Sequence, residues 1–287
     1  MAITITDLRT LPGDSAFLLD NGKTAILYDT GFGFTGLSLT QKLKNALQGR
    51  SLDYIFLTHS HYDHALGSVH VAKAYPDVKV AAHIYAAEVF ARSSARSVMR
   101  QLDHRVARMN GITDYEDLTD QLKVDIAVQD GDSLICGDLR FTVVGLPGHT
   151  KCSVGFYLPA EKLLLGTETL GVYFGQDIYL PSYLVGYGLT MDAYEKVRKL
   201  GVEKMLLPHY GVVGKAETEE YLDKAEKVSR EPAEVIKSLF QDGKTHEEIA
   251  AHLEQSLYKS NVAPIYPVDA FRLNTDFMIE LIKKELI

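Results

Sequence analysis

Several features on which other classes of protein depend are scarce or absent in this sequence of 287 residues. There are only two cysteines, Cys136 and Cys152. Two are too few for a disulfide framework, so we expect a cytoplasmic protein with reduced thiols. No apolar run approaches the roughly 18 residues that a membrane-spanning helix needs. The first residues have neither the basic nor the long apolar region of a secretory signal. We therefore expect no membrane association.

The balance of charge argues against another class of partner. Thirty Lys and Arg stand against 38 Asp and Glu, which gives a net charge of −8 at pH 7. A protein that binds nucleic acid through a strongly basic face is not indicated, so we expect no nucleic-acid partner. The hydrophobic fraction of 46% and the charged fraction of 24% are typical of a globular protein with a sizeable core.

Strands and helices are mixed up to about residue 215, and only helices are predicted after it. Asn21-Gly22 between two apolar runs predicts a β-hairpin. The predicted strands are residues 17–20, 24–28, 53–58, 78–82, 124–128, 133–135, 139–144, 154–158, 162–165 and 204–207. Helices are expected over 36–48 and 65–75, after a cap at Thr190, after a capping box at Thr245–Glu248, and from Pro267. We predict a domain over 1–215, a helical insert over about 84–123, and a helical extension over 216–287.

The most informative segment is Thr58-His59-Ser60-His61-Tyr62-Asp63-His64, which directly follows a predicted strand. Alternate residues of an extended chain share a face, so His59 and His61 can point the same way. The turn that follows can bring Asp63 and His64 to the other side of a common centre. Imidazole and carboxylate ligands suit zinc, iron or manganese. Burying these groups without a metal would leave many polar atoms to satisfy, so we predict a metal site.

Three further candidate ligands are widely spaced along the chain. His149, Glu168 and His209 each lie in a turn directly after a short apolar strand. Polar groups at strand ends are where α/β folds collect their functional sites. The remaining histidines are interpreted as structural or surface residues: His70, His83, His104, His246 and His252.

These residues resemble the metallo-β-lactamase superfamily over about residues 1–215. The likeness rests on His59-x-His61-x-Asp63-His64 with the later His149 and His209, and on the softer marks Asp29-Thr30-Gly31 and Gly148-His149-Thr150. It implies an α/β fold, an αββα sandwich with a two-metal centre at one edge. By this likeness, one metal is held by His59, His61 and His149. The other is held by Asp63, His64 and His209.

One position departs from the pattern of that family, which usually bridges its two metals with an Asp after the strand that here ends at Leu165. This chain has Glu168 instead. A glutamate carries the same carboxylate on an arm one methylene longer, so it can bridge if the backbone retreats. Otherwise it binds one metal or leaves the second site weak. Asp177 lies well past the turn and is a less suitable substitute.

The resemblance implies a metal-dependent hydrolase of a small ester-like substrate, with thioesters or lactones ahead of phosphodiesters. Two divalent metals, zinc foremost and iron or manganese as alternatives, would supply hydroxide, and Asp63 is the candidate proton acceptor. Two alternatives stay open: a mononuclear iron oxygenase acting on a persulfide, and a nearly inert signalling module that keeps its metal. The amphipathic final helix leaves a homodimer open as well.

Substrate choice is expected to depend on the segments around these ligands. Residues 170–189 hold several tyrosines and glycines, which predicts either an aromatic loop beside the substrate or simple packing. The insert and the C-terminal extension are expected to pack on the site or to cover it. The arginines of the insert are interpreted as a solvated helix face rather than an anion site: Arg92, Arg96, Arg100, Arg105 and Arg108. Cys152 is interpreted as a buried small residue.

Overall fold

The computed structural model describes residues 3–259, 261–263 and 266–287. The chain forms two compact units, and neither is continuous in sequence. The first unit comprises Met1–Gly145 and Val154–Glu161, and the second comprises Leu146–Ser153 and Lys162–Ile287. No helix among the described residues combines the length and the apolar character needed to cross a bilayer.

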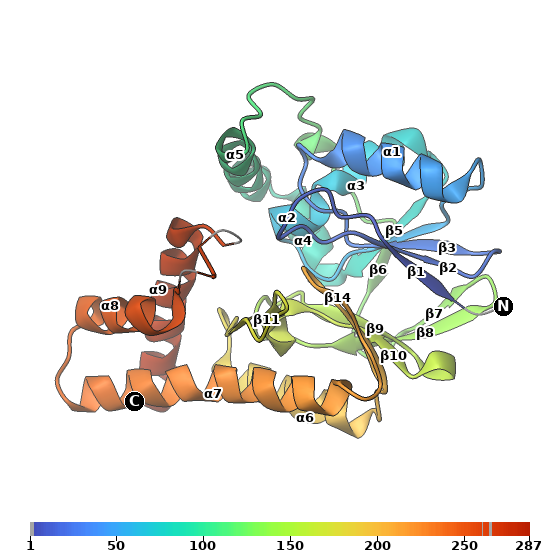
Figure 1. Ribbon diagram of the computed structural model, residues 1–287. Coiled ribbons are helices and arrows are strands. Elements are labelled where there is room, and N and C mark those ends of the chain that lie inside the picture. Colours follow the sequence, from blue (N-terminus) through green and yellow to red (C-terminus); the bar gives the residue numbers. More distant parts are fainter. Residues whose placement is uncertain (1–2, 260, 264–265) are drawn as a thin grey trace. The chain divides into compact units, whose positions relative to one another are not determined.

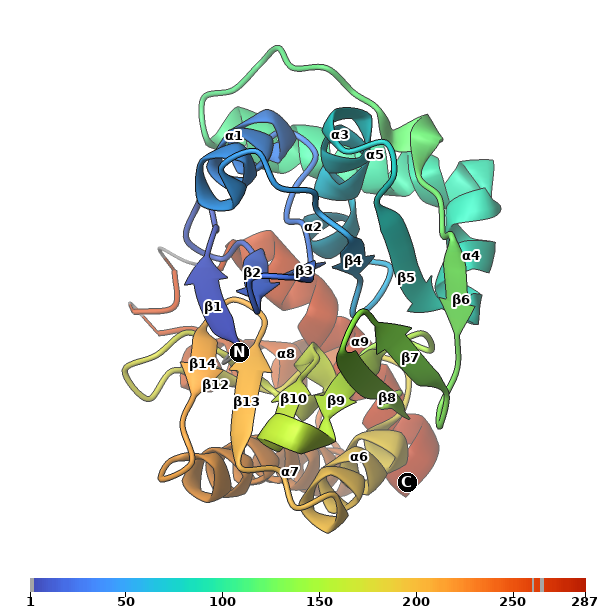
Figure 2. The same ribbon diagram turned by 90° about the vertical axis from the view of Figure 1, so that its right-hand side faces the viewer.

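The first unit is built on a mixed sheet whose strands follow one another in chain order (Figures 1 and 2). They are β1 (Thr4–Asp7), β2 (Phe17–Asp20), β3 (Ala25–Tyr28), β4 (Tyr54–Phe56), β5 (Lys79–His83) and β6 (Ile126–Val128). The pairs from β1 to β3 are antiparallel and those from β3 to β6 are parallel. Every residue of β3 is buried, as expected for a strand covered on both faces. Helices α1 (Gly36–Leu47) and α3 (Gly67–Ala74) lie together on one face.

Three antiparallel strands of a second sheet complete the core of the first unit. They are β7 (Ser133–Cys136), β8 (Leu139–Gly145) and β9 (Val154–Leu158). Phe56 on β4 stacks on Phe156 of β9 with ring centroids 4.3 Å apart. It also meets Phe141 of β8 edge-on at 5.2 Å. These fully buried rings join the two sheets, and offset or edge-on aromatic pairs of this kind add to the free energy of apolar burial.

The predicted insert contains α4 (Ile84–Ala91), α5 (Ser93–Met109) and the short η1 (Thr119–Gln121). The arginines of this insert are partly neutralised within the first unit. Arg96 contacts Asp120 with Nε and Oδ1 3.0 Å apart, and Arg100 pairs with both Asp117 and Asp120. Because these ion pairs lie on the solvated side of α5, they favour the interpretation of a surface face over an anion site.

The second unit contains a three-stranded arrangement and the C-terminal helices. Strand β10 (Leu163–Leu165) pairs in parallel with β13 (Lys204–Leu207), which pairs antiparallel with β14 (Gly211–Val213). Helices α6 (Tyr187–Lys199) and α7 (Thr218–Gln241) lie beside these strands (Figures 1 and 2).

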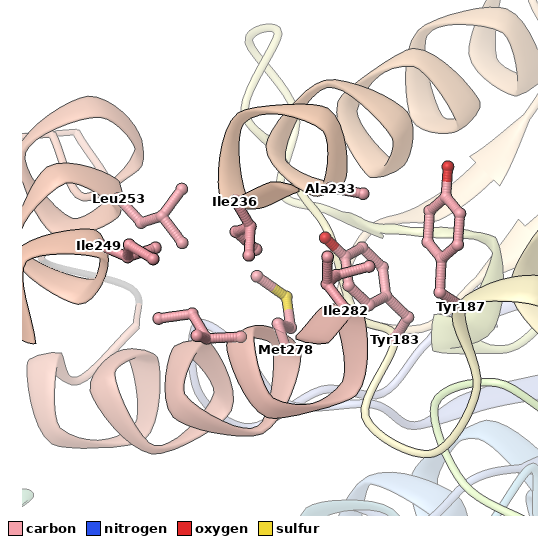
Figure 3. Packing of buried hydrophobic residues seen from close by; sticks show 9 residues of the cluster. Tyr183, Tyr187, Ala233, Ile236, Ile249, Leu253, Met278 and Ile282 are labelled. Carbon is pink, nitrogen blue, oxygen red and sulfur yellow. The ribbon is translucent and has the colours of Figure 1, made fainter. Parts of the chain in front are cut away.

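The C-terminal helices α7, α8 (His246–Leu257) and α9 (Val268–Leu286) share one apolar core. Figure 3 shows Ile236 of α7 and Met278 and Ile282 of α9 directed toward one another. The buried residues of this cluster are Tyr183, Tyr187, Ala233, Ile236, Ile249, Leu253, Met278, Ile279 and Ile282. The capping box predicted at Thr245 and Glu248 is present at the start of α8. The core explains why the periodic apolar positions of these helices are buried.

Two predictions need correction. Helix α6 begins at Tyr187, with Gly186 as its N-cap, so Thr190 is not the cap. The Thr190 hydroxyl instead donates to the Gly186 carbonyl at 2.9 Å, a bond that satisfies threonine inside a helix. Residues 170–189 are not one loop, because β11 (Val172–Tyr173) and β12 (Tyr179–Leu180) form a hairpin there. Its paired backbone groups and stacked tyrosines stabilise it despite the glycines.

Candidate metal centre

The histidine-rich motif lies where β4 gives way to the short helix α2 (Tyr62–Ala65). His61 is the extended N-cap of α2, and Asp63 and His64 lie in its first turn. The imidazole ring of His59 lies 4.6 Å from that of His61 and 4.1 Å from that of His64, between centroids. The side-chain carboxylate of Asp63 is 22% exposed and lies 3.7 Å from His64 Nε2. The structure thus gathers the four residues of the motif within the first unit.

Hydrogen bonds fix the orientation of two of these rings. Asp29, which follows β3, is fully buried; its Oδ2 lies 2.7 Å from His64 Nδ1 and accepts from the Ser15 hydroxyl at 3.0 Å. Its Oδ1 accepts from the backbone N–H of Thr58 at 2.9 Å. The Thr58 hydroxyl lies 2.9 Å from His59 Nδ1. With Nδ1 occupied in this way, Nε2 is the ring nitrogen of His59 and of His64 that remains to bind a metal.

The three later candidates come together within the second unit around a buried carboxylate. Glu168 begins the short helix η3 (Glu168–Leu170), directly after β10. Its Oε2 lies 2.5 Å from His149 Nε2, and its Oε1 lies 2.8 Å from His209 Nε2. Burial acts to raise the pKa of Glu168, but the two imidazoles outweigh it and hold that pKa well below its usual range. The carboxylate is therefore ionised and faces one histidine with each oxygen.

Ser182 orients His149 in the same way that Asp29 orients His64. Its hydroxyl and its backbone carbonyl oxygen lie 2.6 and 3.0 Å from His149 Nδ1. The backbone N–H of His149 also donates to the Thr169 hydroxyl at 3.1 Å. Sequence reasoning missed Ser182, because no local pattern links a serine to a histidine 33 residues earlier. The sequence marks Asp29 only as part of a motif and does not predict its contact with His64.

The backbone at His209 is unusual for a residue other than glycine. Its φ of 65° lies in the left-handed region, where a side chain crowds the backbone. Asp29 has a φ of 51°. Such conformations cost on the order of 1–3 kcal/mol each and persist where the surrounding structure imposes them, often at functional sites.

The donor set fits a metal ion. Each of the seven predicted residues offers an atom that can bind one, four in the first unit and three in the second: His59, His61, Asp63, His64, His149, Glu168 and His209. Imidazoles with an occupied Nδ1, together with carboxylates, are typical of zinc and iron sites. Asp177, by contrast, forms a surface ion pair with Lys224 at 2.8 Å. Cys152 is buried, with its sulfur 3.3 Å from the Thr150 hydroxyl.

The chain belongs to the metallo-beta-lactamase superfamily, whose family model matches residues 10–209. It is similar to the human acyl-coenzyme A thioesterase MBLAC2, with 28% identity over 213 residues, 69% of this chain and 73% of that relative. It is also similar to a hydroxyacylglutathione hydrolase of Brucella anthropi, with 26% identity over 126 residues, 43% of this chain and 35% of that one.

Solved structures agree with the family assignment. A metallo-beta-lactamase family protein of Thermus thermophilus superposes with a TM-score of 0.59 at 22% identity, covering 94% of this chain and 88% of that one. This confirms the predicted α/β metallo-β-lactamase fold. Helices α7, α8 and α9 follow the segment that the family model matches, which confirms the predicted C-terminal helical extension.

Proposed function

We propose that this chain is a metal-dependent hydrolase of small ester-like substrates, and that thioesters are the preferred class. Two similar proteins carry names that support this choice, one a thioesterase of acyl-coenzyme A and the other a hydrolase of hydroxyacylglutathione. Both names describe enzymes that cleave a thioester. Lactones and phosphodiesters remain substrates to be tested beside them.

The observation that carries the proposal is the position of Glu168 between His149 and His209. The resemblance assigns these two histidines to different metals. A carboxylate that turns one oxygen toward each of them is placed to serve both metals at once. We therefore propose a dinuclear centre, with zinc as the first candidate and iron or manganese as alternatives, in which Glu168 takes the place of the usual bridging aspartate.

The ligand sets of the proposed centre are those that the resemblance implies. His59, His61 and His149 would hold one metal, and Asp63, His64 and His209 the other. When bound, two such ions lower the pKa of a water toward neutrality and polarise the carbonyl that is attacked. Asp63 is the proposed proton acceptor, because its carboxylate is the more exposed of the two in the donor set. Asp29 and Ser182 would hold His64 and His149 in orientation throughout.

We also propose separate roles for two segments of the chain. We assign the chemistry to residues 1–215 and substrate selection to the extension over 216–287, with a small molecule as substrate. The buried core shared by α7, α8 and α9 makes the extension a stable element on which to build a binding surface.

The test is a substrate panel on protein purified without chelators. Acyl thioesters, lactones and bis-aryl phosphodiesters would be assayed together with metal content per chain. We expect close to two metal ions and thioester turnover that a chelator abolishes. A single iron with oxygen uptake on glutathione persulfide would instead support the mononuclear oxygenase. Turnover of no substrate by a fully metallated protein would support the signalling module.

A further inference from the structure

Beside the metal-ligand candidate His209 runs a row of aromatic rings within the second unit. The ring of Phe174 lies 6.0 Å from the imidazole of His209, and the ring of Tyr266 lies 6.4 Å from Phe174, between centroids. Phe174 and Tyr266 are both only partly buried. The row therefore extends from the His209 ring toward the C-terminal helices. Part of the apolar surface of Phe174 and Tyr266 stays exposed along it.

Contacts on both sides hold this row in place. Phe174 lies at the start of the turn between β11 and β12, where its N–H donates to the Ile178 carbonyl at 3.1 Å. The hairpin that carries it is braced by Tyr173 and Tyr179, whose rings stack at 4.4 Å. The backbone carbonyl of Tyr266 accepts from the Tyr258 hydroxyl at 2.7 Å. A surface fixed in this way loses little conformational entropy when a ligand binds.

The apolar cluster behind the row explains its character. Ile178, Leu180, Val262 and Phe271 are buried together there, with Phe174 and Tyr266 packed against them. None of these side chains is charged, although the chain carries an excess of acidic residues. An apolar cluster packed beside a metal-ligand candidate suits the hydrocarbon part of a substrate rather than its polar part.

From this we infer that Phe174 and Tyr266 form the wall along which the acyl chain of the substrate lies, so that these residues make the enzyme prefer long-chain over short-chain thioesters. The inference rests on the proposed function and adds the substrate's acyl chain to it. The competing explanation is that Phe174 only supports the His209 ring.

Turnover of dodecanoyl-CoA and butanoyl-CoA separates the two explanations. In Phe174→Ala, we expect the ratio of kcat/KM for the long over the short substrate to fall at least about tenfold, mainly through KM, because the variant removes apolar contact area that only the long acyl chain reaches. Phe174→Leu should lose less, and Tyr266→Phe should keep the ratio. Phe277→Ala, which removes the same side chain from the exposed face of α9, is the matched control and should change neither value. Metal content is measured for every variant.

Two results would overturn the inference. An equal loss for both substrates would mean that Phe174 positions His209, and an unchanged ratio would mean that it does not meet the acyl chain. Binding of the thioethers S-dodecyl-CoA and S-butyl-CoA, measured by calorimetry, tests the wall without turnover. If the wild-type protein hydrolyses no thioester, the proposed function fails, while the acyl wall still stands or falls on whether Phe174→Ala selectively weakens S-dodecyl-CoA binding.

Discussion

Glu168 is a buried, charged side chain at the candidate metal centre. Its carboxylate is almost fully buried, and it is ionised because two imidazoles face it. A buried charge is tolerated only where partners compensate for lost hydration. In this chain the partners are His149 and His209, which we propose as metal ligands. Removing the charge of Glu168 should therefore weaken metal binding by both histidines.

We expect Glu168→Gln to reduce the metal content from about two ions per chain to about one, and to lower thioester turnover at least about 100-fold. A glutamine offers one oxygen and one amide group, and the amide hydrogens repel a cation. Elemental analysis together with kinetics measures both effects.

Asp177→Asn is the matched control for this variant, because it removes a carboxylate of the same unit that only pairs with Lys224 at the surface. It should leave metal content and turnover as they are. Retention of two metals by Glu168→Gln would contradict the bridging role.

Asp103 on α5 is another buried carboxylate, and it is not among the candidate metal ligands. It accepts hydrogen bonds from the N–H groups of Gly33 and Phe34 at 2.9 and 3.2 Å, and from the Tyr115 hydroxyl at 2.5 Å. Burial is the larger influence and raises the pKa of Asp103 from 3.8 to about 6. The folded protein therefore keeps this proton over a range of pH in which the unfolded chain has lost it.

The sign of the resulting pH dependence follows from linkage. The stabilising contribution of the Asp103 proton is complete below pH 3.8 and is lost as the pH rises through about 6. We expect the free energy of unfolding of the wild type, relative to Asp103→Asn, to fall by up to about 3 kcal/mol between pH 4 and pH 7. Urea unfolding of both proteins across this range measures the difference. A flat difference would show that Asp103 has an ordinary pKa in the folded state.

At the scale of elements, helix α7 supports the turn that carries Glu168. The fully buried Tyr221 hydroxyl donates to the backbone carbonyls of Leu170 and Gly171, at 2.8 and 3.3 Å. These carbonyls lie at the end of η3, which Glu168 begins. A residue of the C-terminal extension thus acts as a positioning residue for a candidate ligand 53 positions earlier in the chain.

Tyr221→Phe should therefore weaken metal binding about tenfold as well as lower the free energy of unfolding by about 1–2 kcal/mol. The matched control is Tyr194→Phe, whose buried hydroxyl bonds to Ser229 on α7 at 3.2 Å. It should cost similar stability and leave metal affinity unchanged. Equal metal affinities in Tyr221→Phe and the wild type would remove the positioning role.

Local sequence patterns predict some of the elements around the candidate metal centre and miss others. The strands that precede His59, His149 and Glu168 were foreseen, because short apolar runs bounded by turns indicate buried strands. The position of Ser182 beside His149 was not, since a bond between distant segments leaves no local periodicity. Helix α6 was placed too late, because a threonine can bond back within a helix as readily as it can cap one.

At the scale of the whole molecule, metal binding and folding should be coupled. A ligand that binds only the folded state stabilises it by about 4 kcal/mol at a free concentration 1,000 times its Kd. For a chain of this size we expect EDTA to lower the Tm by about 10 °C and zinc to restore it. Differential scanning calorimetry measures the shift. The shift should be smaller in Glu168→Gln, and an EDTA-treated protein with unchanged Tm and no remaining metal would contradict the coupling.

The chain passes between its two units three times, at residues 145–146, 153–154 and 161–162. No single cut can release either unit intact. A fragment ending at Gly145 would lack β9, the antiparallel partner of β8, and would expose a strand edge that invites aggregation. Dissection by truncation should therefore fail for residues 1–145, whereas insertions after the last of these crossings interrupt only the second unit. Residues can therefore be added at the C-terminal end during evolution without interrupting the first unit. Helices α7, α8 and α9 lie in that part of the chain.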